Sequence, residues 1–241
     1  MHTPFFGEFM GTLVLVLLGN GVVANVVLKK TLGENSGWLV ICTGYGLGVM
    51  AGVLTAIACG SSDAHINPAV TLGMAIAQND FSKVATYLPA QLLGAMVGAL
   101  FVWLHYMPHF AVTTDKGSKL ACFSTGPAIP STGSNIFSET LGTFMLVMLI
   151  GAIFSKSASL SGPAPVLGPF LVGLAVWLIG LCLGGTTGFA INPARDLGPR
   201  IMHAILPIPD KGGSNWGYAG VPIIGGLVGG VLAGAFIKAV F

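Results

Sequence analysis

Hydrophobic residues along the chain fall into six long runs separated by shorter polar connections. Each run holds about 20 mainly apolar residues, the length that an α-helix needs to cross the hydrocarbon core of a bilayer. Their approximate bounds are Phe5–Leu28, Gly37–Ala58, Val84–Tyr106, Ile136–Ser155, Pro165–Leu183 and Gly217–Val240. The pattern therefore predicts an all-α membrane protein with six transmembrane helices.

Two further apolar runs, about Asn67–Ala77 and Asn192–Ile205, are too short to cross a bilayer. Each begins with Asn-Pro-Ala. Asn is among the best residues for capping a helix N-terminus, and Pro is favoured at the first helical position because its missing N–H would be unpaired there anyway. We therefore expect two re-entrant half-helices that begin inside the bilayer.

The two halves of the chain are related. Phe6-Gly7-Glu8-Phe9-Met10-Gly11-Thr12 matches Phe137-Ser138-Glu139-Thr140-Leu141-Gly142-Thr143 in its Phe, Glu, Gly and Thr positions. Because three spans separate equivalent points, the halves must have opposite orientations, as in an inverted repeat. We expect one domain, residues 1–241, with repeat 1 at about 1–107, a connecting loop at about 108–135 and repeat 2 at about 136–241.

An inverted repeat brings the two Asn-Pro-Ala starts together near the middle of the bilayer. Two positive helix ends and the amides of Asn67 and Asn192 then offer hydrogen-bond donors at one point and oppose cations. Arg195, three residues after Asn192, shares its helix face and adds a permanent charge. This combination predicts a pore for small neutral polar solutes that excludes ions and protons. Arg200, five residues further, is expected to lie at the mouth or to anchor the segment.

Composition agrees with a membrane channel and excludes other classes. Of 241 residues, 54% are hydrophobic and only 7% are charged, and the net charge of +2 is too small to indicate a nucleic-acid partner. No nucleophile, phosphate loop or metal-ligand cluster has a recognisable spacing, so we expect no enzyme activity, no metal and no cofactor. The expected location is the cell (plasma) membrane, as a multi-pass protein, in a prokaryotic inner membrane.

The motifs together resemble a known family. SSDAHINPAVT around Asn67, TGFAINPARDLGP around Asn192, and Glu8 and Glu139 are similar to the major intrinsic proteins, the aquaporins and glycerol facilitators. The resemblance implies the aquaporin fold, a homotetramer with one pore in each subunit, and passive conduction. It also implies that the pore motifs are Asn67, Pro68, Ala69, Asn192, Pro193 and Ala194, and that Glu8 and Glu139 brace the re-entrant loops. We expect His65, two residues before Asn67, to fix its loop by hydrogen bonds, with a pH gate as the alternative role.

Four residues place the resemblance in the glycerol facilitator, or aquaglyceroporin, branch. Asp196 after Arg195, Pro222 in Val221-Pro222-Ile223, Phe189 and Gly180 are similar to that branch rather than to strict water channels. The resemblance implies conduction of glycerol, similar polyols and water through a selectivity filter of Tyr45, Gly180, Phe189 and Arg195.

One position departs from the pattern of that branch. Glycerol facilitators generally carry Trp before Gly-Leu-Gly-Val, and this chain has Tyr45. The interval from Tyr45 to Asn67 is also longer by about two residues, so Thr43 or Gly44 is an alternative pore-facing residue. A wider or more polar constriction leads us to expect a broader range that includes dihydroxyacetone, urea, hydrogen peroxide or protonated lactic acid.

Two alternatives and one conflict accompany this interpretation. A water-selective aquaporin is the first alternative, and a gradient-coupled secondary transporter, which also uses inverted repeats, is the second. The resemblance places both termini inside the cell. That orientation puts Lys29, Lys30, Lys116, Lys119 and Lys211 outside but only Lys83, Lys156 and Lys238 inside, contrary to the positive-inside rule.

Overall fold

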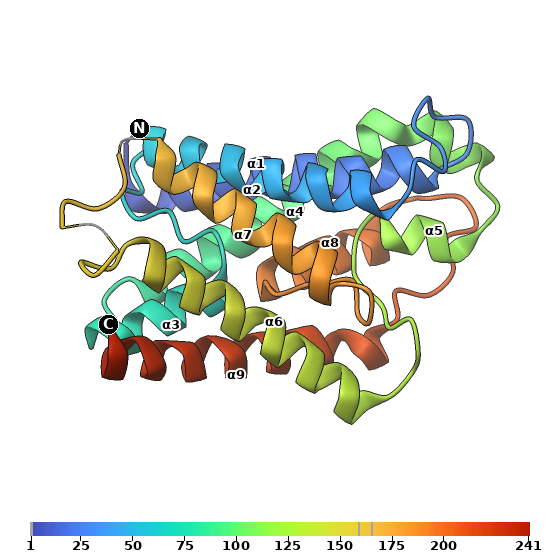
Figure 1. Cartoon of the computed structure of the whole chain (residues 1–241). Coiled ribbons are helices and arrows are strands. Elements are labelled where there is room, and N and C mark those ends of the chain that lie inside the picture. The colour runs from blue at the N-terminus through green and yellow to red at the C-terminus, as the bar shows by residue number, and fades with distance from the viewer. Residues whose placement is uncertain (1, 159, 165) are drawn as a thin grey trace.

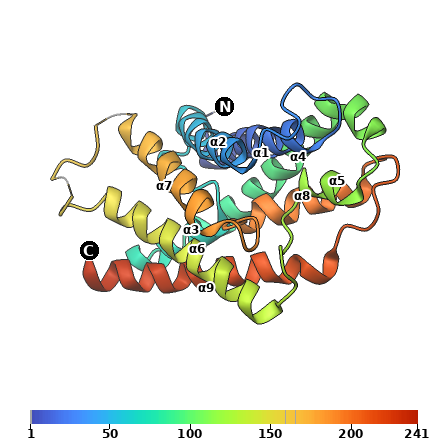
Figure 2. The same cartoon turned by 45° about the vertical axis from the view of Figure 1, so that its right-hand side comes forward.

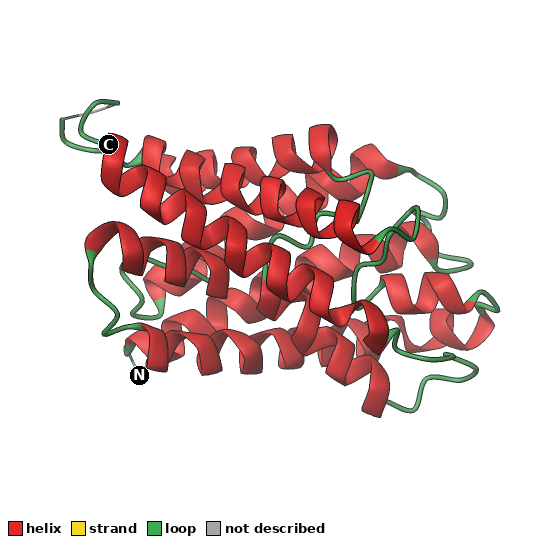
Figure 3. Cartoon of the chain, turned by 90° about the horizontal axis from the view of Figure 1, so that it is seen from below, coloured by secondary structure: helices red, strands yellow, loops and turns green. Residues whose placement is uncertain are grey.

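The computed structural model describes residues 2–158, 160–164 and 166–241, and within these ranges it consists of helices joined by turns and loops (Figure 3). The helices are α1 (Pro4–Val27), α2 (Trp38–Ala58), α3 (Pro68–Gln78), α4 (Val84–Val112), α5 (Lys116–Ala121), α6 (Thr132–Ile153), α7 (Leu167–Leu183), α8 (Pro193–Ile205) and α9 (Trp216–Val240).

Six of these helices run along the bundle from one end to the other. α1, α2, α4, α6 and α9 each have at least 18 residues and are apolar enough to cross a membrane. α7 has 17 residues, which is the lower limit for a spanning helix. Both termini lie at the same end of the bundle, opposite α5 (Figure 1), as an even number of crossings requires.

The two half-helices are held by the opposite halves of the chain. α3 packs against α9, and α8 packs against α4, while the starts of α3 and α8 approach each other in the centre (Figure 2). Glycines in α9 permit the close approach of α3: a Cβ on Gly230 would lie 2.4 Å from the Ala69 carbonyl oxygen, and one on Gly234 would lie 2.2 Å from that of Gly73. Each half-helix is therefore buried by a helix from the other repeat.

The segment expected to be the connecting loop contains more helix than predicted. α4 continues past Tyr106, through Pro108, to Val112, where the Thr113 hydroxyl donates to the His109 carbonyl oxygen at 2.7 Å. The expected connecting loop also contains α5, whose first turn is capped by Asp115, which accepts from the Ser118 N–H at 2.6 Å. Apolar composition marks where a helix leaves the membrane, and polar caps decide where it ends. The expected start of the fifth span at residue 165 lies outside the described residues.

The end of the bundle that carries α5 holds the lysines that conflict with the positive-inside rule. Three of them have specific partners. Lys29 pairs with Glu34 at 2.8 Å, and Lys211 donates to the Ala204 and Leu206 carbonyl oxygens at the end of α8. Lys119 is buried and donates to the Pro209 carbonyl oxygen. These cations therefore hold loops and a helix end in the folded state.

Candidate functional site

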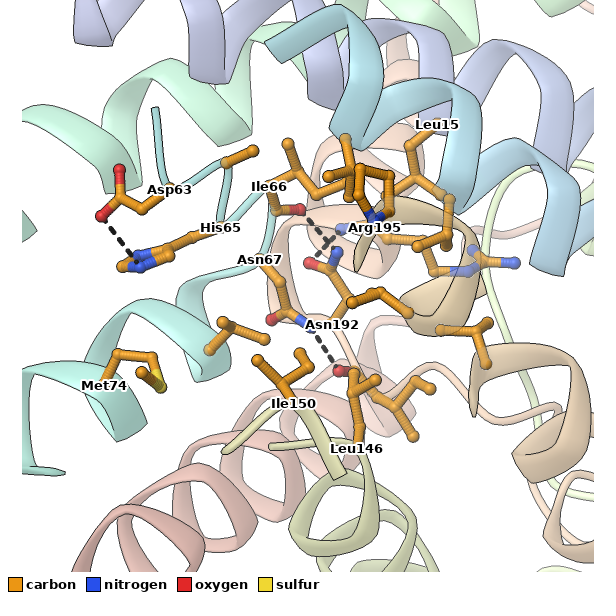
Figure 4. A pocket seen from close by; sticks show the side chains of 18 of the residues that line it. Leu15, Asp63, His65, Ile66, Asn67, Met74, Leu146, Ile150, Asn192 and Arg195 are labelled. Atoms are coloured by element: carbon orange, nitrogen blue, oxygen red, sulfur yellow. Dashed lines mark hydrogen bonds and ion pairs between the residues drawn. The ribbon is translucent and has the colours of Figure 1, made fainter. Parts of the chain in front are cut away.

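A cavity of about 380 Å³ lies between the two halves of the chain. Residues of α1, α2, α3, α6, α7, α8 and both re-entrant loops line it. Asn67 and Asn192 lie in its middle, Arg195 lies towards one end, and Asp63 and His65 lie towards the other (Figure 4). Most of the remaining lining is aliphatic, so the polar groups form a single path through an apolar wall.

The two Asn-Pro starts are linked to each other by reciprocal hydrogen bonds. Asn67 accepts from the Ala69 N–H at 2.9 Å, which caps α3, and its amide donates to the Ile191 carbonyl oxygen at 2.8 Å. Asn192 caps α8 in the same way, and its amide donates to the Ile66 carbonyl oxygen at 2.9 Å. Since an amide carries two N–H groups, each Asn retains one donor for the cavity that it lines.

The loops before these starts have the same unusual backbone. φ is positive three residues and one residue before each Asn: 43° and 46° at Ala64 and Ile66, and 39° and 42° at Phe189 and Ile191. A β-branched residue such as Ile rarely adopts this conformation, so the surrounding structure must hold it there. The shared geometry of the two loops is independent evidence that the halves are related.

Two buried carboxylates hold these loops. Glu8 accepts from the His65 and Ile66 N–H groups at 2.8 and 2.7 Å, and Glu139 accepts from the Ala190 and Ile191 N–H groups at 3.0 and 2.9 Å. Both side chains have no exposed surface. Neither lines the cavity, so their position matches bracing of the loops rather than contact with a solute.

Tyr45, Phe189 and Arg195 meet at one end of the cavity. The Tyr45 and Phe189 rings pack edge to face with centroids 5.6 Å apart, and the Arg195 guanidinium lies 4.8 Å from the Tyr45 ring centroid. Arg195 also donates to the Tyr45 hydroxyl and, at 3.2 Å, to the Phe123 carbonyl oxygen. Gly180 leaves room for the Phe189 ring, because a Cβ there would lie 2.9 Å from it.

The position of Tyr45 removes the two alternatives at the second span. Thr43 lies on the other side of α2, where it lines a separate apolar hollow with Trp177. A Cβ on Gly44 would lie 2.6 Å from the Val22 side chain, so this face of α2 packs on α1.

Trp38 was not singled out by the sequence analysis but belongs to the same group of aromatic residues. Its ring packs edge to face on Phe189 with centroids 5.6 Å apart, and its indole N–H donates to the Gly180 carbonyl oxygen at 3.1 Å. A Trp at the first residue of a span is usually read as an interfacial anchor. Because a Trp at this position has that common role, the sequence alone did not indicate its contact with Phe189.

Asp196, Arg200 and Pro222 lie outside the cavity. Arg200 is fully buried and donates to Asp196 at 2.7 and 2.9 Å and to three backbone carbonyl oxygens. Asp196 in turn accepts from the N–H and hydroxyl of Thr125, both at 2.8 Å. The pair therefore fixes the loop that supports Arg195. Of the two positions expected for Arg200, at the pore mouth or as an anchor, this contact corresponds to the anchor. Pro222 is buried within α9.

At the other end of the cavity, His65 and Asp63 form a polar group with two residues near the start of α4. Asp63 lies 3.2 Å from the His65 ring nitrogen, 2.5 Å from the Lys83 ammonium and 2.5 Å from the Tyr87 hydroxyl. The other His65 ring nitrogen lies 3.2 Å from the Thr71 hydroxyl. Burial lowers the pKa of His65 to about 4. The ring is thus neutral near pH 7 and fixed on both sides.

Comparison with known proteins decides the family. The family model described as major intrinsic protein matches residues 2–237. The chain belongs to the major intrinsic protein family. This major intrinsic protein is 52% identical over 238 residues to a probable glycerol uptake facilitator protein of Thermotoga maritima, with 98% of this chain and 99% of the relative covered. It is 49% identical to the glycerol uptake facilitator protein of Bacillus subtilis, with 99% and 85% covered.

A solved structure gives the same result for the fold. The X-ray structure of the aquaglyceroporin from Plasmodium falciparum matches with a TM-score of 0.84 and 33% identity, covering 98% of this chain and 95% of that one. The predicted aquaporin fold and multi-pass location in a cell membrane are confirmed, and the bacterial relatives agree with a prokaryotic membrane. Membership in this family also confirms the expectation of a channel rather than an enzyme.

Proposed function

We propose that this major intrinsic protein is a passive channel for glycerol and similar small neutral polyols. The observation that carries the proposal is the cavity in which Asn67, Asn192 and Arg195 form one line of donors along an aliphatic wall. A polyol has hydroxyls that accept from these donors and a carbon backbone that can lie against the wall. Glycerol uptake facilitators among the relatives support this solute class.

We assign the pore motifs and the filter as the sequence analysis expected. Asn67 and Asn192 present donors at the centre, while Tyr45, Phe189 and Arg195 form the constriction and Gly180 makes room for Phe189. The positive ends of α3 and α8 and the fixed charge of Arg195 oppose cations and protons. The whole chain acts as one channel domain built from two repeats, and four copies assemble as a homotetramer.

The solute range extends beyond glycerol in this proposal. Tyr45 is smaller than the Trp of the glycerol facilitator pattern, so the constriction admits water, hydrogen peroxide and small carbonyl or acid solutes such as dihydroxyacetone, urea and protonated lactic acid. Replacement of Tyr45 by Trp is expected to narrow this range. An unchanged solute profile in that variant would contradict the role given to Tyr45.

The test is stopped-flow light scattering on proteoliposomes that contain the purified protein. Glycerol, water, dihydroxyacetone, urea and lactic acid are compared at low and neutral pH, with and without a proton or sodium gradient. Glycerol flux that exceeds that of empty vesicles and does not depend on the proton or sodium gradient supports the passive channel. Water flux alone would indicate a water-selective aquaporin, and flux that follows a gradient would indicate a secondary transporter.

A further inference from the structure

The tyrosine of the constriction is supported by two neighbouring residues of α1 that do not line the cavity, Gly19 and Asn20. We propose that Gly19 and Asn20 are positioning residues that set the selectivity of the channel by fixing the Tyr45 ring and its hydroxyl. The inference rests on the proposed function, since it concerns which solutes the same constriction admits.

Gly19 provides the space in which the Tyr45 ring lies. A Cβ at this position would lie 2.4, 2.7 and 2.9 Å from three carbon atoms of that ring. Such distances are far below van der Waals contact, so any larger residue must push the ring away from α1. Because Tyr45 lines the cavity and its ring packs on Phe189, we expect a ring pushed away from α1 to move towards the cavity and narrow the constriction.

Asn20 fixes the direction of the Tyr45 hydroxyl. The side chain of Asn20 is fully buried, and its Oδ1 accepts the Tyr45 hydroxyl proton at 2.5 Å. Its Nδ2 donates to the Phe123 carbonyl oxygen at 3.1 Å, the same oxygen that accepts from Arg195 at 3.2 Å. Arg195 donates through its other nitrogen to the Tyr45 hydroxyl. Asn20, Tyr45, Arg195 and Phe123 thus form a closed hydrogen-bonded ring.

This cycle of hydrogen bonds determines which donors and acceptors the constriction presents to a solute. A phenolic hydroxyl has one proton, and Tyr45 donates it in the hydrogen bond to Asn20. Towards Arg195 and the cavity, the Tyr45 hydroxyl can therefore only accept hydrogen bonds. Two guanidinium nitrogens each use one N–H on the protein, which fixes the plane of the guanidinium and leaves the remaining N–H groups for solute hydroxyls. If the Asn20 side chain is replaced by an apolar one, the Tyr45 hydroxyl proton loses its acceptor. The aromatic ring of Tyr45 and the Arg195 guanidinium then gain freedom to move.

Substitutions at Gly19 and at Asn20 are therefore expected to change the size of the constriction in opposite directions. Gly19→Ala narrows it, so glycerol flux falls relative to water flux. Asn20→Leu, which has a similar volume but no polar atoms, loosens it, so discrimination between glycerol and the longer polyol erythritol falls. From the usual net contribution of one hydrogen bond, we expect the glycerol-to-erythritol permeability ratio to fall about fivefold in Asn20→Leu.

The experiment measures permeability ratios in proteoliposomes by stopped-flow light scattering. Gly21→Ala is the matched control, because it makes the same change two residues along α1, where a Cβ meets nothing within 4 Å. Each variant is first required to elute from size exclusion as the wild type does. The ratios do not depend on how much protein is active, so a loss of folded channel alone does not change them.

A second background separates positioning from general damage. Tyr45→Phe removes only the hydroxyl and is expected to reproduce the change seen in Asn20→Leu, while Asn20→Leu added to Tyr45→Phe is expected to change the ratio no further. Equal effects of Asn20→Leu in both backgrounds, or equal effects of Gly19→Ala and Gly21→Ala, would overturn the proposal. If Asn20→Leu does not fold, Tyr45→Phe alone still tests it, because an unchanged ratio contradicts a role for the hydroxyl.

The measurements distinguish a failure of the proposed function from a failure of the positioning role. Absence of glycerol flux in the wild type would reject the glycerol channel, and the urea-to-water ratio in the same variants would then test the positioning role. Normal wild-type glycerol flux with unchanged ratios in all variants would reject the positioning role alone.

Discussion

The hydrogen bonds of Glu139 predict a graded loss of stability when its acceptors are removed. The carboxylate is fully buried, and each of its oxygens accepts one backbone N–H, from Ala190 at 3.0 Å and from Ile191 at 2.9 Å. Glu139→Gln replaces one acceptor oxygen by an NH₂ group and leaves one backbone donor unpaired. Glu139→Ala leaves both unpaired and also removes the hydrogen bond between Glu139 and the Thr187 side chain.

The magnitude follows from the cost of an unpaired buried donor. One such group costs about 1–3 kcal/mol, so we expect Glu139→Gln to lower the free energy of unfolding by that amount. Glu139→Ala should lower it by about 2–6 kcal/mol, before any relaxation of the loop. Because Ile191 has a positive φ that only its surroundings hold, the loop should also relax and displace Phe189 from the constriction.

The assay is an SDS titration of the detergent-purified protein, with the folded fraction followed by circular dichroism, and glycerol flux measured on the same preparations. Glu34→Gln is the control, because Glu34 lies in a loop where it pairs with Lys29 at 2.8 Å, and its effect should be smaller than that of either variant at 139. Wild-type stability in Glu139→Gln, or equal losses in the Gln and Ala variants, would refute the reasoning.

Three further predictions concern other parts of the fold. Gly230→Ala should destabilise the channel in SDS titration because its Cβ would lie 2.4 Å from a carbonyl oxygen of α3, whereas Gly220→Ala on the same helix, with no atom closer than 3.9 Å, should not. Arg200→Met leaves Asp196 as an uncompensated buried charge and should cost about 3–5 kcal/mol of unfolding free energy; a loss below that of Gly230→Ala would contradict this. Because burial lowers the pKa of His65 from 6.5 to about 4, folding excludes a proton, and stability present above pH 6.5 should be lost as pH falls towards 4; in His65→Gln this loss should be smaller, as SDS titrations across that range would show.

The sequence was sufficient for the architecture because the signals for it are local. Runs of about 20 apolar residues mark the spans, and Asn-Pro-Ala marks a helix start whatever surrounds it. The reach of α4 to Val112 was missed because its end depends on Thr113, whose hydroxyl accepts from the Lys29 N–H at 2.9 Å, a contact between distant segments that only the folded chain makes.

The proposed constriction could be predicted only in part. Tyr45, Phe189 and Arg195 were recognised from the resemblance, and the structure brings them together at one end of the cavity. Asn20 and Trp38 were missed, although an Asn in the middle of an apolar span is a visible signal. What they contact depends on how α1, α2 and the second re-entrant loop cross, and no pattern within one segment contains that information.

The exchange of half-helices between the repeats has a consequence for biosynthesis. α3 is made early but packs against α9, which is made much later, and the Asn67 amide finds its acceptor only when residue 191 has been made. The cavity is lined by residues of both repeats, so the conducting path is complete only after the second half-helix has been made. A nascent chain that has reached only the first repeat therefore has no finished pore.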